Sequence, residues 1–389
     1  MIKFRLRKNL VYLLIYYISW YLRRMVNIAI KFLFNFHPTY ILLYLMTLGE
    51  IIGGSSIFFY QKKSWKKNME SKYFGLNLIY NKKEIKILDG QFKRIILIFF
   101  AACFDFFEFI IGNFFVPKVD SNVSQTIDLR LGCVTTIASS LICSNALSFK
   151  IGKHHKVSLI IMGLCAFFSL IIEISYKPNN ISFGRFIFAR FLVCYSLACI
   201  SFIDCIEKYL VDTNFLNPFK ILMTEGTFEF IMAIFISIEQ DPFKEIIKLH
   251  EEKSNGQFIL FIFLLFLYLL LSTIINAYKI YCNVIYSPMA RSLMDYFMGP
   301  FFCTYHYIEN GDFQNDFIYF FLSEIINIIT VFFGCVYNEY IILFCCGIEH
   351  DTTDAIAERA LSKYNKTIIY KLGEIINNED ENNDTLEFN

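Results

Sequence analysis

Acidic side chains stand inside stretches of this sequence that are otherwise apolar. Glu50 lies in the run ILLYLMTLGEIIGGSSIFFY, which covers residues 41–60. A charged side chain near the centre of a bilayer costs about 2.5–3.5 kcal/mol on insertion scales, so such a residue is normally retained for a reason. The sequence leaves two hypotheses open: Glu50 binds a solute or a proton in a polar cavity, or it ties two helices together.

Two further acidic pairs have helical spacing. Asp105 and Glu108 are three residues apart, and Glu225 and Glu229 are four apart, so each pair shares one face of its helix. Two close carboxylates in a medium of low dielectric constant cannot both ionise cheaply. For Asp105 and Glu108 this chemistry suits a proton-coupled carrier, whereas docking of helices is the alternative for Glu225 and Glu229. The alternative is that Asp105 and Glu108 neutralise a basic side chain such as Arg130 on the next span.

Two arginines begin apolar segments in the same way. Arg130 and Arg291 lie near the extramembrane ends of their spans, where an arginine either extends to the interface or binds an anion such as phosphate or carboxylate. Asp295 follows Arg291 by four residues, which favours an ion pair within one helix. Nucleotide-binding loops, catalytic nucleophile motifs and metal-ligand spacings are absent from the sequence, so we expect neither an enzyme, nor a cofactor, nor a metal site.

The composition predicts the elements that must position these residues. The chain has 389 residues, of which 56% are hydrophobic and 18% charged, with a net charge of +1. Apolar runs recur along it, many near the length of about 20 residues that crosses a bilayer as a helix. We expect an all-α polytopic membrane protein of ten transmembrane helices, near residues 9–30, 37–60, 93–116, 126–148, 157–175, 184–206, 217–238, 257–281, 286–307 and 315–346.

Charged loops and sequons predict the orientation of these spans. Segment 61–94 is rich in lysine and is expected in the cytosol, together with both termini. Asn122 and Asn180 belong to N-glycosylation sequons and fall in loops on the opposite side. The remaining segment, 347–389, is expected to be a cytosolic tail in which a short helix precedes an acidic, disordered end.

Short matches between the two halves indicate an internal repeat. A proline precedes a helix with an embedded glutamate in FHPTYILLYLMTLGEIIGG and again in LNPFKILMTEGTFEFIMAIF. Arg130 and Arg291 give a second match. The pairing of span two with seven and of span four with nine predicts five-helix repeats over 1–178 and 179–346. Because five is odd, the repeats are inverted, an arrangement typical of secondary transporters. The pattern from Gly49 to Gly53 should let a neighbouring helix approach closely.

The same segments carry a resemblance to a known family. HP at 37–38 with LGE at 48–50 resembles the second span of the drug/metabolite transporter superfamily, chiefly its nucleotide-sugar-transporter-like and chloroquine-resistance-transporter-like solute carriers. Residues 129–167 resemble its spans four and five, 207–230 the junction of spans six and seven, 287–297 the start of span nine and 336–343 the end of span ten. The resemblance extends over most of the chain, from about 36 to 346.

The resemblance implies alternating access to a small organic metabolite, an anion being one option, in an endomembrane (Golgi, ER, lysosome or vacuole) rather than the plasma membrane. The bilayer and the solute are the expected partners, with protons and a second copy of the chain as further candidates and no nucleic acid. The predicted substrate-binding residues are Glu50, Asp105, Glu108, Arg130, Glu225, Arg291 and Asp295. The alternative is a transport-inactive relative that acts as a membrane scaffold.

Overall fold

The structure is a computed structural model, and it describes most of the apolar segments. The described residues are 2–4, 10–34, 39–61, 91–116, 131–147, 149–175, 182–214, 216–237, 246–247, 249–251, 253–297, 299–301, 303–304, 317–344, 347–353 and 355–359. Arg130, both sequon asparagines, most of segment 61–94 and most of the tail lie outside these ranges.

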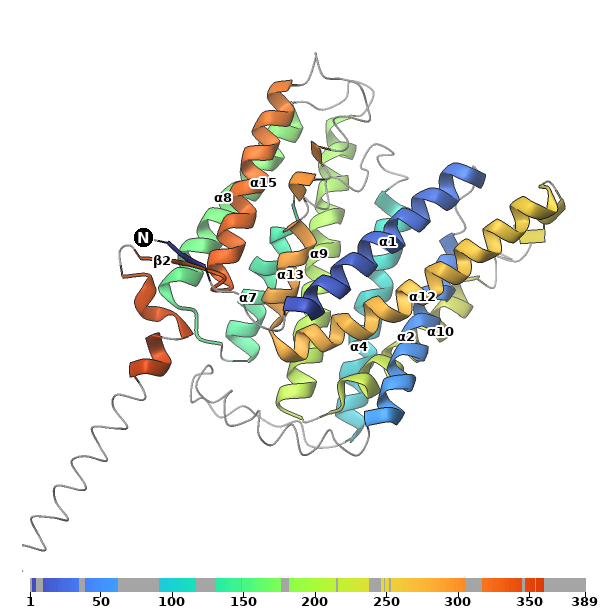
Figure 1. The fold of residues 1–389 in the computed structure, drawn as a ribbon, viewed down its shortest axis with the longest axis horizontal. Helices are drawn as coiled ribbons and strands as arrows, with labels where there is room; N and C mark the ends of the chain where they lie inside the picture. The colour runs from blue at the N-terminus through green and yellow to red at the C-terminus, as the bar shows by residue number, and fades with distance from the viewer. Residues whose placement is uncertain are drawn as a thin grey trace, which may run out of the picture.

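A helix lies in each of the ten predicted segments (Figure 1). In chain order they are α1 (Leu10–Phe34), α2 (Thr39–Gln61), α4 (Gln91–Ile110), α7 (Cys133–Ala146), α8 (Lys153–Ser175), α9 (Phe183–Asp212), α10 (Pro218–Ser237), α12 (Asn255–Ile285), α13 (Pro288–Phe297) and α15 (Phe317–Tyr337). A π-helical turn, η1 (Ile111–Phe115), continues α4. The predicted all-α class is therefore confirmed in outline.

Helix length and composition identify a multi-pass membrane protein. Five helices in the described ranges are long and apolar enough to cross a membrane, namely α2, α8, α9, α12 and α15, and α7 is a shorter apolar helix. Among the remaining helices, α13 has only 10 residues. The finer prediction of ten complete spans goes beyond this observation.

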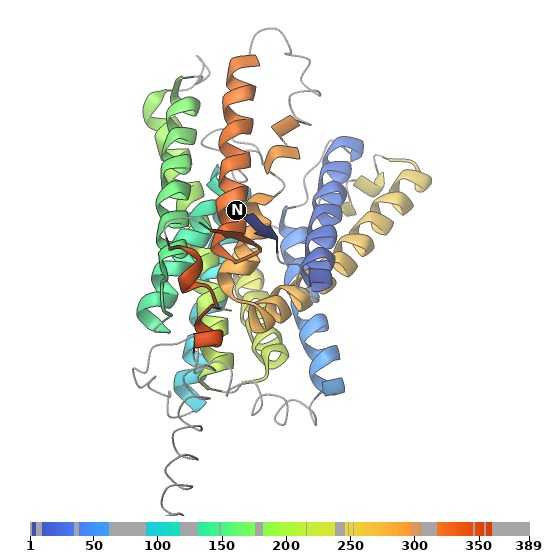
Figure 2. The same cartoon turned by 60° about the vertical axis from the view of Figure 1, so that its left-hand side comes forward.

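The helices pack in a small number of long pairs. α2 lies between α10 and α12, and α1 packs alongside α12. α4 packs on both α9 and α10, α7 packs on α9 and α13, and α15 runs beside α8. Figure 2 shows α1 and α2 on the side of α12 and away from α8. α9 and α10 each contact both α4 and α12, so these four helices join α1 and α2 to the rest of the bundle.

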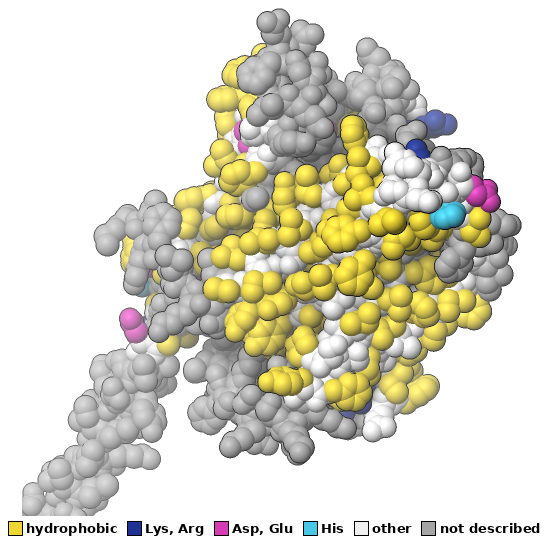
Figure 3. Space-filling view, turned by 45° about the vertical axis from the view of Figure 1, so that its right-hand side comes forward, with side chains coloured by type: hydrophobic (Ala, Val, Ile, Leu, Met, Phe, Trp, Pro, Cys, Tyr) yellow, Lys and Arg dark blue, Asp and Glu magenta, His cyan; other side chains and the backbone are white. Residues whose placement is uncertain are grey.

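The outer surface is more apolar than that of a soluble protein. Large hydrophobic side chains point outward along the helices, and Phe59, Ile259 and Phe266 are 69%, 68% and 62% exposed. Figure 3 shows one face on which such side chains form a broad patch, with charged groups near its margins. Many charged side chains are instead buried, as Glu50, Asp204 and Arg291 are. This inversion of the usual arrangement is expected when lipid is the solvent.

The last predicted segment, 315–346, is too long for one straight span, and the helix in it is shorter. Helix α15 ends at Tyr337 and does not continue to residue 346. Glu339 follows in the left-handed region with φ 58°, which a helix cannot accommodate. Residues Ile341–Leu343 then form strand β2, which pairs antiparallel with β1 (Ile2–Phe4), Lys3 opposite Ile342. The apolar run was continuous in sequence, but a two-stranded sheet replaces its last turns.

Polar contacts hold the segment after β2 in place, to Glu339 before the strand and to the start of α8. The Oε1 atom of Glu339 accepts hydrogen bonds from the backbone N–H and the hydroxyl of Thr353, at 2.7 and 2.8 Å. Asp351, in the single turn η2 (Glu349–Asp351), accepts a hydrogen bond from the backbone N–H of Lys153 at 3.0 Å. That bond lowers the pKa of Asp351, because it stabilises the ionised carboxylate.

Candidate functional site

The crossing of α2 and α10 positions the first acidic residues. A Cβ atom at Gly54 of α2 would lie 2.6 Å from the backbone nitrogen of Met223, and one at Gly226 of α10 would lie 2.7 Å from the Cβ of Glu50. Glycines at both positions therefore allow the two backbones to touch. Glu50 and Glu225 are both 3% exposed, so the contact carries their carboxyl groups into the interior.

The neighbouring glycines of α2 meet a different helix. A Cβ at Gly49 would lie 2.9 Å from the Cβ of Ser272, and one at Gly53 would lie 2.9 Å from the carbonyl oxygen of Thr273, both on α12. The predicted close approach at this small-residue pattern is confirmed. The helix α2 is thus held between α10 and α12 by two sets of glycines on different sides.

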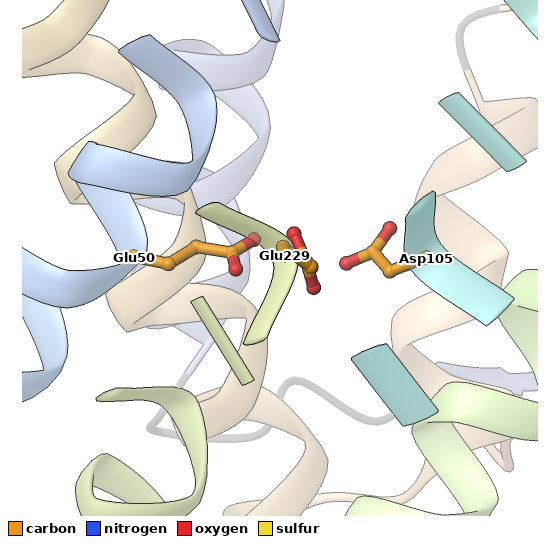
Figure 4. Close-up of side chains that lie close together, drawn as sticks. All are labelled: Glu50, Asp105 and Glu229. Atoms are coloured by element: carbon orange, nitrogen blue, oxygen red, sulfur yellow. The ribbon is translucent and has the colours of Figure 1, made fainter. Parts of the chain in front are cut away.

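Three carboxyl groups meet where α2, α4 and α10 come together. One oxygen of Glu50, one of Asp105 and one of Glu229 all lie within 4.8 Å of one another. Figure 4 shows Glu229 between the other two, with the three side chains pointing into a shared space. We call Glu50, Asp105 and Glu229 the carboxylate triad. Glu229 is fully buried and Glu50 nearly so, whereas the side chain of Asp105 is 16% exposed.

Lys279 of α12 connects the triad to α9. Its Nζ lies 3.4 Å from Oδ2 of Asp105 and 3.9 Å from Oε1 of Glu207. The lysine side chain is 13% exposed and that of Glu207 is 1% exposed. One buried cation is therefore shared between two carboxylates on different helices, α4 and α9, which lowers the cost of burying all three charges.

Asn283 continues the polar contacts along α12. Its side-chain amide donates to Oδ1 of Asp204 at 2.9 Å and to Oε2 of Glu207 at 2.6 Å. Asp204 in turn lies 2.5 Å from Nε of Arg291. Asn283 thereby joins the group around Lys279 to a second basic residue, on α13.

Arg291 ends this chain of contacts. It lies 3.3 Å from Asp295, so the predicted ion pair within one helix is confirmed, and it donates to the hydroxyl of Tyr16 at 3.1 Å. At 2% exposure it is buried and does not extend to an interface. We call this set, together with the buried Glu225 at the crossing of α2 and α10, the buried polar network; its members are Glu50, Asp105, Asp204, Glu207, Glu225, Glu229, Lys279, Asn283, Arg291 and Asp295.

The network contains most of the residues that the sequence singles out. Glu108 is not one of the named members, and its carboxylate accepts a hydrogen bond from Ser196 of α9 at 3.1 Å. Asp105 and Glu108 share a helix but have different partners. Arg190 of α9 is paired with Glu173 of α8 at 3.1 Å.

Several network residues were not predicted as site residues. Asp204 and Glu207 are three apart on α9, and Lys279 is one basic residue in a long apolar run. Both are signals that the sequence contained, because an ionisable residue inside an apolar helix marks a functional site by default. Glu229 was recognised as the neighbour of Glu225, but its place in the triad depends on α2 and α4.

The comparisons with known proteins give no family for the chain. No model of a known protein family matches its sequence, and no curated protein matches it either.

Proposed function

We propose that the chain is a secondary transporter that moves a small organic solute across an intracellular membrane by alternating access. The observation that carries this proposal is the buried polar network, which joins six helices in the interior of an apolar bundle. Ionisable groups at such positions are costly and mark substrate, ion or proton pathways in membrane proteins. A purely structural bundle needs few of them.

The helix contacts support the proposed pair of five-helix repeats. If each helix of the first half corresponds to the one five spans later, the contact of α1 with α12 corresponds to that of α9 with α4. The contact of α2 with α12 corresponds likewise to that of α10 with α4. The pairs α2 with α10, α7 with α13 and α8 with α15 map onto themselves. A two-fold relation between the halves, as in transporters with inverted repeats, accounts for this pattern.

The charge balance of the network bears on what is carried. Among the described residues it has seven carboxyl groups and two basic side chains, the latter being Lys279 and Arg291. An acidic excess attracts cations or protons, so coupling to a cation or a proton fits this site better than binding of an anion alone. The anionic solute, which rests on the family resemblance, stays a prediction.

Proteoliposomes provide the test. We would measure uptake of a fixed panel of labelled amines, amino acids, carboxylates and nucleotide sugars, with and without a pH gradient. The wild type should take up at least one class faster than protein-free vesicles. Glu50→Gln, which removes a charge from the triad, should reduce that uptake at least tenfold. Glu324→Gln, on α15 and bonded to Thr304 at 3.0 Å, is the matched control and should leave it unchanged.

The scaffold hypothesis gives the opposite result. It is favoured by the basic groups of the network already having acidic partners and by the close contacts of α2 with α10 and α12. Uptake equal to that of protein-free vesicles for the whole panel would contradict transport. Equal uptake by the wild type and Glu50→Gln would contradict a role for this residue.

A further inference from the structure

The carboxylate triad has the dimensions of a cation site. Two oxygens on opposite sides of an ion are separated by twice the metal–oxygen distance, which is about 4.2 Å for Mg²⁺ and about 4.8 Å for Ca²⁺. The three oxygens of the triad lie within 4.8 Å of one another. Because they come from α2, α4 and α10 (Figure 4), an ion bound between them would contact three helices.

The buried oxygens of the triad lack hydrogen-bond donors. Neither carboxyl oxygen of Glu229 accepts a hydrogen bond from another described residue, and the same holds for Oε2 of Glu50. Glu229 is 0% exposed and Glu50 is 3% exposed. A buried acceptor without a donor costs about 1–3 kcal/mol, and more when it is charged. Both side chains point into the shared space of the triad, so these are the atoms that a ligand bound there would satisfy.

The basic residue beside the triad does not fill this role. Of the three triad residues, Lys279 pairs with Asp105 on α4, and its second partner is Glu207 on α9, outside the triad. Among the described residues, Glu50 and Glu229 have no ion pair with Lys, Arg or His. Lys279 is shared between Asp105 and Glu207, so acidic groups outnumber basic ones around the triad, and a divalent cation would compensate this excess.

We propose that Glu50, Asp105 and Glu229 bind one divalent cation. Carboxylate oxygens alone favour hard ions, namely Mg²⁺, Mn²⁺ or Ca²⁺, over zinc or copper, which prefer histidine and cysteine. The ion would join α2 and α10 to α4, across the two proposed repeats. Its role as the coupled ion rests on the proposed function, whereas its binding does not.

Manganese is the probe for this site, because the electron paramagnetic resonance signal of free Mn²⁺ falls when the ion binds. The purified full chain would be titrated in nanodiscs of phosphatidylcholine, which adds no anionic headgroup. The wild type and the control Glu324→Gln should each bind one Mn²⁺ per chain. Glu50→Gln and Glu229→Gln, which keep the side-chain shape but remove a charge, should weaken binding at least tenfold.

Two results would overturn the proposal: no saturable binding to the wild type, as expected if the triad only exchanges protons, or equal binding by all four proteins. If both glutamine variants elute as aggregates in size-exclusion chromatography, Glu229→Asp replaces them, because it keeps the charge but shortens the side chain and moves its oxygens away from the other two. A Mn²⁺ affinity of Glu229→Asp equal to that of the wild type would overturn the site. Uptake by a chain that binds no Mn²⁺ would overturn the ion site alone. Binding without uptake of any panel solute would overturn transport alone.

Discussion

At the scale of single residues, Lys279 has the most consequential position in the molecule. It is the basic group that compensates Asp105 on α4 and Glu207 on α9. Removing one partner of a buried ion pair leaves the other charge uncompensated, at a cost of about 3–5 kcal/mol. Removing charges on both sides costs less, because no orphaned charge is left.

We therefore expect Lys279→Met to lower the stability of the folded protein strongly. The measurement is the temperature at which half of the detergent-solubilised protein is lost from its monodisperse peak in size-exclusion chromatography. The double variant Lys279→Met with Asp105→Asn should recover part of the loss. If the double variant is less stable than Lys279→Met alone, the two residues do not form the pair described above.

At the scale of the elements, glycines decide how closely α2 and α10 approach. A Cβ at Gly226 would meet the Cβ of Glu50 at 2.7 Å and the backbone nitrogen of Ile51 at 3.1 Å. The obstacles include backbone, which cannot rotate aside as a flexible side chain could. Overpacking of this kind typically costs about 1–3 kcal/mol.

Gly226→Ala should accordingly displace Glu50 from the triad and lower the melting temperature, taken again as the temperature at which half of the protein is lost from its monodisperse peak. The matched control is Gly163→Ala on α8, where an added Cβ has nothing within 4 Å. That change should be neutral or slightly stabilising, since alanine is favoured over glycine in a helix by up to about 1 kcal/mol. Equal melting temperatures for the two variants would contradict the close crossing of α2 and α10.

The helices themselves could largely be read from the sequence, but their ends could not. Each apolar run became a helix, because in lipid a backbone must satisfy its hydrogen bonds within the segment. The exception is the end of α15, where Tyr340 donates its backbone N–H to Cys335 at 2.9 Å and the chain turns into β2. The strand partner, β1, lies at the opposite end of the sequence, so local hydropathy did not indicate it.

At the scale of the whole molecule, the exposed side chains predict which faces meet lipid. Phe266 of α12 is 62% exposed, whereas Phe261, five residues earlier, is fully buried against Phe34. The two positions belong to the same helix and therefore test orientation without a change of element.

Tryptophan fluorescence can distinguish these faces. In a background with Trp20→Phe and Trp65→Phe, the variant Phe266→Trp should be quenched several-fold more by lipids with brominated acyl chains than Phe261→Trp. Bromine quenches only indole groups that it can contact. Equal quenching at the two positions would contradict the burial of α12 against α1 in the membrane.

The sequence by itself determined the class of the protein, because lipid as solvent requires long apolar helices, and it indicated that Glu50 faces inward, because charge is costly in hydrocarbon. The burial of Arg291, in place of an interfacial position, was decided only by the tertiary structure. Only the tertiary structure decided the partners. Lys279 and Asp105 are 174 residues apart, and a hydropathy pattern indicates which face of a helix is polar but not which helix lies opposite it. The triad exists because glycines let α2 and α10 touch beside α4, and that contact depends on three helices at once.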